Sequence, residues 1–210
     1  MRYLRLAALP VLLIATTAAS AQVTGLPVMN DGLTRGVVVG MEVGFPDQDY
    51  GNGTAFGLRA SVGSSRLGLS GVISRFNVDD PFPDQTGYGL AANLNLLPAP
   101  GLIGATLQAG AEAFFLNGDA KWHFPIGLGL ALRRPSRGAL LKPWIAPRID
   151  LFRNSFATPT QTDTNFGLSG GIDFLARDAI GFTFAVDRVF AGNGFHPTTF
   201  SFGARYRVVR

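Results

Sequence analysis

Histidine, cysteine and carboxylate side chains would carry most chemistry in this sequence, and the first two are scarce. The chain has two histidines, His123 and His196, and no cysteine. A thiolate nucleophile, a disulfide framework and a cysteine-based zinc site are excluded, and two histidines are too few for a typical structural zinc site. We therefore expect no metal and no cofactor.

A histidine and an aspartate form the best candidate pair. The segments around His123 and Asp150 are separated by a turn-forming sequence, Pro135 to Gly138. If these segments are adjacent antiparallel strands, His123 lies near Asp150, and such a pair could supply the base of a hydrolase. Because no serine is placed beside the pair, a structural role is favoured over catalysis, and no catalytic residue is predicted.

A second motif has the spelling of a hydrolase nucleophile. The run from Gly167 to Gly171 matches G-x-S-x-G around Ser169. In hydrolases that motif occupies a turn from a strand into a helix, whereas here a period-two pattern continues through it and no helical pattern follows. We interpret the match as chance in a glycine-rich strand.

The elements that must position these residues are β-strands. From Lys121 to Arg133 the large apolar residues occupy every second position, and small or charged residues occupy the others. Successive side chains of a strand point to opposite faces, so one face of this segment is apolar and the other carries glycine, alanine and a few charges. A face of glycine, alanine and a few charges suits the crowded lumen of a closed barrel.

The same alternation recurs along the chain and predicts a ten-stranded antiparallel up-and-down transmembrane β-barrel, with eight strands as the alternative. The ten predicted strands are Thr34–Phe45, Thr54–Ser64, Arg66–Phe76, Thr86–Leu97, Leu102–Phe115, Lys121–Arg133, Leu140–Arg153, Thr164–Leu175, Ile180–Phe190 and Thr198–Val209.

The chain begins with a pattern typical of export. Two arginines precede a short apolar run, and Ala19-Ser20-Ala21 resembles a cleavage site before Gln22. Residues 1–21 are therefore predicted to be a cleaved signal peptide, and residues 22–210 a single barrel domain. Within that domain, residues 22–33 form a short leader that lies on the periplasmic side or folds into the barrel mouth.

Composition argues for a membrane barrel over a soluble one. Charged residues make up only 15% of the chain, and there are 27 glycines. The remaining structural rival is a soluble β-sandwich or lipocalin-like barrel, whose outer face would carry many more charges. The net charge of +4 is not concentrated in a Lys/Arg block, so no nucleic-acid partner is expected.

The connections and aromatic residues fit the same architecture. Short turns, as at Ser64-Ser65, alternate with mostly longer loops, as from Pro46 to Gly53. Aromatic residues occur where strands meet the longer loops and are expected to form an interfacial girdle. The expected girdle consists of Phe45, Phe56, Phe76, Tyr88, Phe115, Trp122, Phe166, Phe190 and Phe200.

With its signal peptide, its ten alternating segments and a terminal pattern containing Phe200, Phe202, Tyr206 and Val208, the chain resembles small β-barrels of bacterial outer membranes. This resemblance implies a location in the outer membrane, with the barrel assembly machinery, outer-membrane lipid and lipopolysaccharide as partners. Such barrels commonly end on an aromatic residue, and this chain departs from that pattern by ending on Arg210.

Eight charged residues fall on the predicted lumen face, where a narrow bore should force them to pair. They are Glu42, Arg59, Glu112, Arg148, Asp150, Asp173, Asp187 and Arg205. Inward glycines, among them Gly40, Gly89, Gly127 and Gly171, could instead leave a continuous water path between these charges.

Two further expectations concern the barrel wall. Pro125, Pro143 and Pro147 each remove a ladder donor, so we expect a bulge or a locally frayed pair near them. Three arginines fall on the outward face at the loop ends of their strands and could bind lipopolysaccharide phosphates. They are Arg75, Arg153 and Arg188.

The sequence therefore predicts an integral outer-membrane barrel with a narrow, charge-lined lumen. Its role is either that of a small-solute pore or that of an envelope-integrity protein. An outer-membrane hydrolase using His123 and Asp150, and a surface protein that binds a ligand through its loops, are the alternatives from other functional classes.

Overall fold

The computed structural model describes residues 25–33, 35–79, 83–97, 101–116, 119–136, 139–154, 161–176, 179–192 and 194–209. The predicted signal peptide, residues 1–21, lies outside the described residues, as do parts of several connections. In the described part of the chain, no helix is long and apolar enough to span a bilayer.

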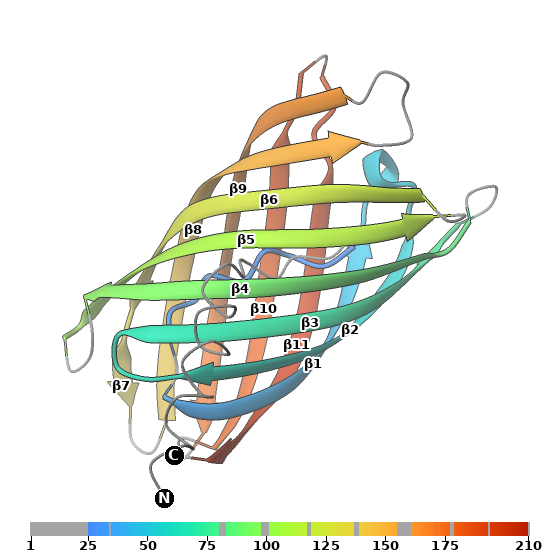
Figure 1. Ribbon diagram of the computed structural model, residues 1–210. Helices are drawn as coiled ribbons and strands as arrows, with labels where there is room; N and C mark the ends of the chain where they lie inside the picture. The colour runs from blue at the N-terminus through green and yellow to red at the C-terminus, as the bar shows by residue number, and fades with distance from the viewer. Residues whose placement is uncertain are drawn as a thin grey trace, which may run out of the picture.

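Eleven strand segments form one antiparallel sheet that closes on itself (Figure 1). The segments are β1 (Gly36–Pro46), β2 (Gly53–Gly63), β3 (Leu67–Val78), β4 (Gln85–Leu97), β5 (Ile103–Leu116), β6 (Asp119–Leu132), β7 (Arg134–Ser136), β8 (Ala139–Asn154), β9 (Gln161–Ala176), β10 (Ile180–Phe190) and β11 (Thr198–Val209).

The wall has ten strands, because β7 continues β6. Both segments pair with β8 in a single register, β6 through pairs such as Ala131 with Trp144 and β7 through pairs such as Arg134 with Leu141. The barrel closes where β1 pairs with β11. The predicted ten-stranded antiparallel barrel is confirmed, and the eight-stranded alternative is wrong.

The three wall prolines interrupt the ladder without shifting it. The β5–β6 pairing has a gap beside Pro125, and the β6–β8 pairing has a gap beside Pro147. A third gap, opposite Pro143, separates β6 from β7. Proline lacks the N–H that a ladder requires, so pairing is lost locally while the register on either side is kept. The two register shifts lie elsewhere, at Val37/Val38 and Asn95/Leu97.

The outward face is a belt of large apolar side chains, of which Leu58 is 66% and Met41 62% exposed. Exposure of so much apolar surface is unfavourable in water but suits the hydrocarbon core of a bilayer. Eight of the nine aromatic residues predicted for the girdle are 39–50% exposed. Phe76 is the exception: it is fully buried in the lumen, where it packs with Leu26 and Ala55.

We call the two ends of the barrel the loop end and the turn end. The turn end contains the start of β1, the end of β11 and short connections such as residues 64–66 (Figure 1). The loop end carries the 3-10 helix η2 (Gln48–Tyr50), whose N-cap Asp47 accepts a hydrogen bond from the Asp49 amide at 3.1 Å. The Asp49 carboxylate also accepts a hydrogen bond from the backbone amide of His196 in the β10–β11 loop, and the Asp47 carboxylate accepts one from the amide of Thr198 at the start of β11.

Candidate functional site

The leader runs through the lumen instead of staying at its mouth. Leu26 and Val28 are each 1% exposed, and Gly25 lies against Ala55 and Phe76 near the loop-end side. From there the segment continues to Leu33, whose side chain lies over Gly68 near the turn end. The leader is therefore a plug within the barrel, deeper than the sequence predicted.

Polar contacts hold this plug at its middle. The amide nitrogen of Gln108 donates to the Met29 carbonyl at 3.0 Å, and the amide nitrogen of Asn30 donates to the Thr106 carbonyl at 3.3 Å. The Asp31 carboxylate accepts hydrogen bonds from Lys142 Nζ at 2.7 Å and from Arg205 at 2.7 Å. These contacts reach three different wall strands, β5, β8 and β11, so they fix the leader laterally as well as along the axis.

Asp31 completes a cluster that we call the turn-side layer, formed by Asp31, Lys142, Asp173 and Arg205. Asp173 also pairs with both cations, with Lys142 at 2.9 Å and with Arg205 at 2.8 Å. Burial alone would raise the pKa of Asp31, but Lys142 and Arg205 outweigh that effect and hold the pKa well below its usual range. The plug is thus anchored through a carboxylate that stays ionised.

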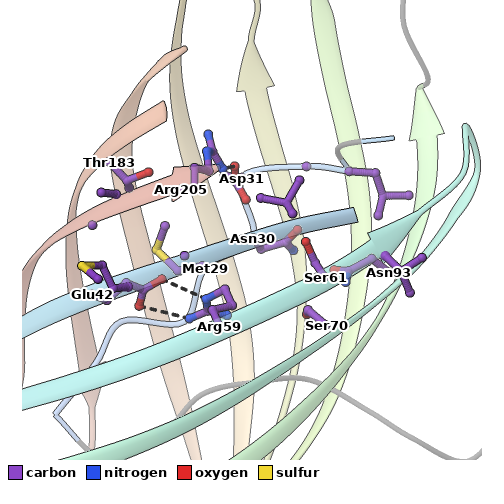
Figure 2. A pocket seen from close by; sticks show the side chains of 18 of the residues that line it. Met29, Asn30, Asp31, Glu42, Arg59, Ser61, Ser70, Asn93, Thr183 and Arg205 are labelled. Atoms are coloured by element: carbon purple, nitrogen blue, oxygen red, sulfur yellow. Dashed lines mark hydrogen bonds and ion pairs between the residues drawn. The ribbon is translucent and has the colours of Figure 1, made fainter. Parts of the chain in front are cut away.

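A second ion pair lies beside the leader. Arg59 Nε donates to Glu42 Oε1 at 2.8 Å, and another guanidinium nitrogen donates to Glu42 Oε2 at 3.2 Å. Figure 2 shows this pair next to Met29 and Asn30, with Asp31 beside Arg205. Beside this pair, between the leader and the wall, lies a cavity of about 80 Å³, which is large enough for a few waters.

Nearer the loop end, six residues form a cluster that we call the loop-side layer. Arg148 binds both oxygens of Asp187, donates to Asp150 Oδ1 at 2.8 Å and donates to Ser169 Oγ at 2.6 Å. His123 continues the network from Asp150 to Glu112. Its members are Glu112, His123, Arg148, Asp150, Ser169 and Asp187, and each is at most 3% exposed.

Both ring nitrogens of His123 are bonded to carboxylates. Its Nδ1 lies 2.9 Å from Glu112 Oε2 and its Nε2 lies 2.8 Å from Asp150 Oδ1. The ring is also stacked on Phe152, with centroids 4.2 Å apart. A general base needs a free nitrogen within reach of the proton that it removes. The His123 ring, bonded on both sides, is better suited to joining the Glu112 and Asp150 carboxylates than to activating a nucleophile.

Ser169 likewise lacks the surroundings of a nucleophile. Its hydroxyl bonds to Arg148 and Asp187, and β9 continues through Gly167 to Gly171 as a strand. A Cβ added to Gly167 would collide with the Arg148 guanidinium, and one added to Gly171 would meet Trp144. The motif therefore reflects glycines that make room for large neighbouring side chains.

Several inward glycines face space that other groups of the protein occupy. A Cβ at Gly127 would meet Arg148, one at Gly57 would meet Leu26, and one at Gly129 would meet Asn30. Glycine is needed wherever another chain segment approaches the wall this closely. The glycines on β1, β2 and β6 are thus the signal in the sequence that could have revealed the leader.

A larger cavity of about 650 Å³ lies at the loop end. Tyr50, Lys121, His123, Phe152 and Asp163 are among its lining residues, so the loop-side layer forms part of its wall. Burial, followed by the negative charge of Asp187, raises the pKa of Tyr50 above its usual value. The Tyr50 hydroxyl therefore stays protonated at physiological pH.

All eight residues of the predicted lumen network lie in buried or partly buried ion pairs. The sequence placed these charges on one face but did not assign partners, and it missed Asp31.

Arg75, Arg153 and Arg188 are exposed on β3, β8 and β10, so they are spread around the circumference. Arg75 pairs with Asp84 at 2.7 Å, and Arg188 lies over the Phe190 ring. Within the described ranges, no cluster of ligating side chains could hold a metal ion.

No protein-family model and no curated protein matches the chain. Among solved structures, it is similar to the outer membrane enzyme PagL, with 10% identity and a TM-score of 0.44 over 81% of this chain and 99% of that one. It is also similar to the KdgM porin in complex with disordered oligogalacturonate, with 10% identity and a TM-score of 0.41 over 80% and 98%. The N-terminal β-barrel domain of Pseudomonas aeruginosa OprF is 8% identical, with a TM-score of 0.36 over 80% and 97%.

At these identities the likeness concerns the fold alone. The chain has the fold of a small, closed, antiparallel β-barrel with an apolar outer belt and a charged lumen.

Proposed function

We propose that this barrel is closed by its own leader and serves the integrity of the envelope instead of the passage of solutes. The main support is the path of residues 25–33: residues 25–30 are buried against the inner wall, and Asp31 is bound by Lys142 and Arg205. The loop-side layer closes the bore a second time. A barrel of about ten strands is little wider than the eight-stranded kind that side chains alone can fill.

The test is the conductance of the purified full-length protein in a planar bilayer. We expect small and infrequent steps, because ions would have to pass the leader and both ion-pair layers. Frequent steps as large as those of a general porin would overturn the proposal and make diffusion the function.

The proposal includes export and insertion. A signal peptide cleaved before Gln22 would leave three residues ahead of Gly25, and insertion would depend on the barrel assembly machinery. The mature N-terminus then has to enter the lumen before or during closure of β1 on β11. N-terminal sequencing of the envelope form should begin at Gln22.

Orientation can be tested with single cysteines, because the chain has none of its own. We expect the loop end to face outward, as in other outer-membrane barrels. Gly192 at the loop end has open space around it, and Arg66 at the turn end is exposed. A membrane-impermeant maleimide on intact cells should label Gly192→Cys and spare Arg66→Cys. Labelling of Arg66→Cys alone would invert the model.

Lipopolysaccharide remains the proposed lipid partner of Arg75, Arg153 and Arg188. If the loop end faces outward, these guanidinium groups lie at the depth of outer-leaflet phosphates. The triple Ala variant should then retain markedly less lipopolysaccharide through purification than wild type. Equal retention would show that the three side chains only extend toward water.

The loop-end cavity supports a second candidate function, capture of a small ligand at the cell surface. Its volume of about 650 Å³ lies within the common range for small-molecule sites, about 300–1,000 Å³. A ligand that raises the melting temperature saturably, and does so less for Lys121→Ala, would favour this function. A broad screen without any such ligand would leave the structural role.

A further inference from the structure

The turn end contains a separate cavity with an excess of positive charge. It has a volume of about 250 Å³ and lies below the turn-side layer. Arg35, Arg133 and Arg207 line it together with Lys142, and the one carboxylate in its lining is Asp31. We call it the turn-end cavity.

The Asp31 carboxylate does not neutralise the positive charge of these arginines. Asp31 is already bound by Lys142 and by Arg205, and Lys142 also pairs with Asp173. Three arginines therefore line one small space, and no carboxylate in the described part of the chain is paired with them.

Two of these arginines are positioned but not neutralised. Arg133 donates to the carbonyl oxygens of Gly101 at 3.2 Å and Leu97 at 3.4 Å, which orients the guanidinium without cancelling its charge. Arg207 follows Arg205 on the inward face of β11, and its Nε is buried without a hydrogen-bond partner in the described structure. A buried donor left unpaired is unfavourable, and an anion in the cavity would satisfy it.

We propose that the turn-end cavity binds a phosphate group through Arg35, Arg133 and Arg207. Guanidinium groups bind phosphate oxygens through paired, charge-assisted hydrogen bonds, so convergent arginines recognise phosphate more specifically than they recognise a halide. The group could belong to a soluble phosphorylated solute or to a lipid headgroup at the same membrane surface. The arginines line the lumen mouth and not the lipid face, which favours the soluble source. This site does not depend on whether the barrel conducts.

The first test uses the full-length protein in detergent, titrated with inorganic phosphate and with pyrophosphate by calorimetry. We expect saturable binding that weakens about tenfold for each arginine removed in Arg133→Gln and Arg207→Gln, where each tenfold step corresponds to about 1.4 kcal/mol. Arg66→Gln is the matched control, because Arg66 lies at the same end, is exposed and does not line the cavity. It should bind as wild type does.

A second measurement on wild type guards against variants that fail to fold. Phenylglyoxal should modify Arg207 more slowly when phosphate is present, while modification of Arg66 should not change.

To decide whether the bound phosphate belongs to a soluble solute or to a lipid headgroup, the protein in nanodiscs with and without phosphatidylglycerol is titrated with pyrophosphate. Weaker pyrophosphate binding in the anionic nanodiscs identifies a headgroup as the occupant, and equal binding identifies a soluble ligand. Absence of saturable binding and of phosphate protection in wild type would overturn the site.

Discussion

Replacing Arg148 by alanine is expected to destabilise the barrel more than any other single substitution in the lumen. The side chain is 1% exposed and binds Asp150, Ser169 and Asp187 together. Removing one partner of a buried ion pair leaves an uncompensated charge, which costs about 3–5 kcal/mol. Here two carboxylates would lose the same cation, so we expect the loss to lie at the upper end of that range.

Equilibrium unfolding in one detergent or lipid system, followed by tryptophan fluorescence, would measure this loss. The matched control is Arg153→Ala, which removes an exposed arginine from the same strand and should change the free energy of unfolding by no more than about 0.5 kcal/mol. The double variant Arg148→Ala/Asp187→Ala should recover part of the loss, because it removes an unpaired charge as well. Equal stability of Arg148→Ala and Arg153→Ala would contradict the loop-side layer.

Replacing residues 26–31 by a Gly/Ser sequence is expected to open the bore. The exchange keeps the length of the chain but removes the buried apolar side chains of Leu26 and Val28 and the carboxylate of Asp31. Without these anchors the leader should leave the lumen, and the small cavity beside Glu42 and Arg59 should join the turn-end cavity. Single-channel steps should then be larger and more frequent than in wild type.

Combining the Gly/Ser replacement with Arg148→Ala should enlarge the single-channel steps further, because the loop-side layer is then weakened too. Asp31→Asn should produce a smaller effect in the same direction, since it keeps the packing but loses the two ion pairs. Asp84→Asn, which removes an exposed carboxylate at the loop end, is the control and should behave as wild type. If the Gly/Ser exchange leaves conductance unchanged, the leader is not the barrier.

The period-two pattern was sufficient to predict the wall. Alternation of residues such as Met41 and Leu58 with glycine and charge identifies the faces of each strand without knowledge of its neighbours. The same pattern placed Glu112, His123 and Asp150 on one face. It did not predict that His123 bonds to both carboxylates, because that depends on side-chain reach across two strand pairs.

The leader could not be predicted in the same way. Residues 25–33 form no ladder, so they carry no periodic signal, and their position depends on contacts with distant strands. The error at Phe76 follows from this omission: an aromatic residue near a loop was assigned to the lipid interface, whereas Leu26 provides it with a partner inside the barrel. The prolines gave the correct location of ladder breaks, but sequence alone could not decide between a bulge and a gap.

The most direct test of the leader's place in the lumen is a disulfide between Leu26→Cys and Gly57→Cys. A Cβ added at position 57 would meet the Leu26 side chain, and the Leu26→Cys substitution removes the methyl group that crowds it. A disulfide requires Cβ atoms about 3.5–4.5 Å apart. We predict that the two cysteines cross-link under mild oxidation in the folded protein, while Leu26→Cys with Gly192→Cys does not. Failure of the first pair to cross-link, together with free labelling of Cys at position 26 by maleimide, would contradict the account.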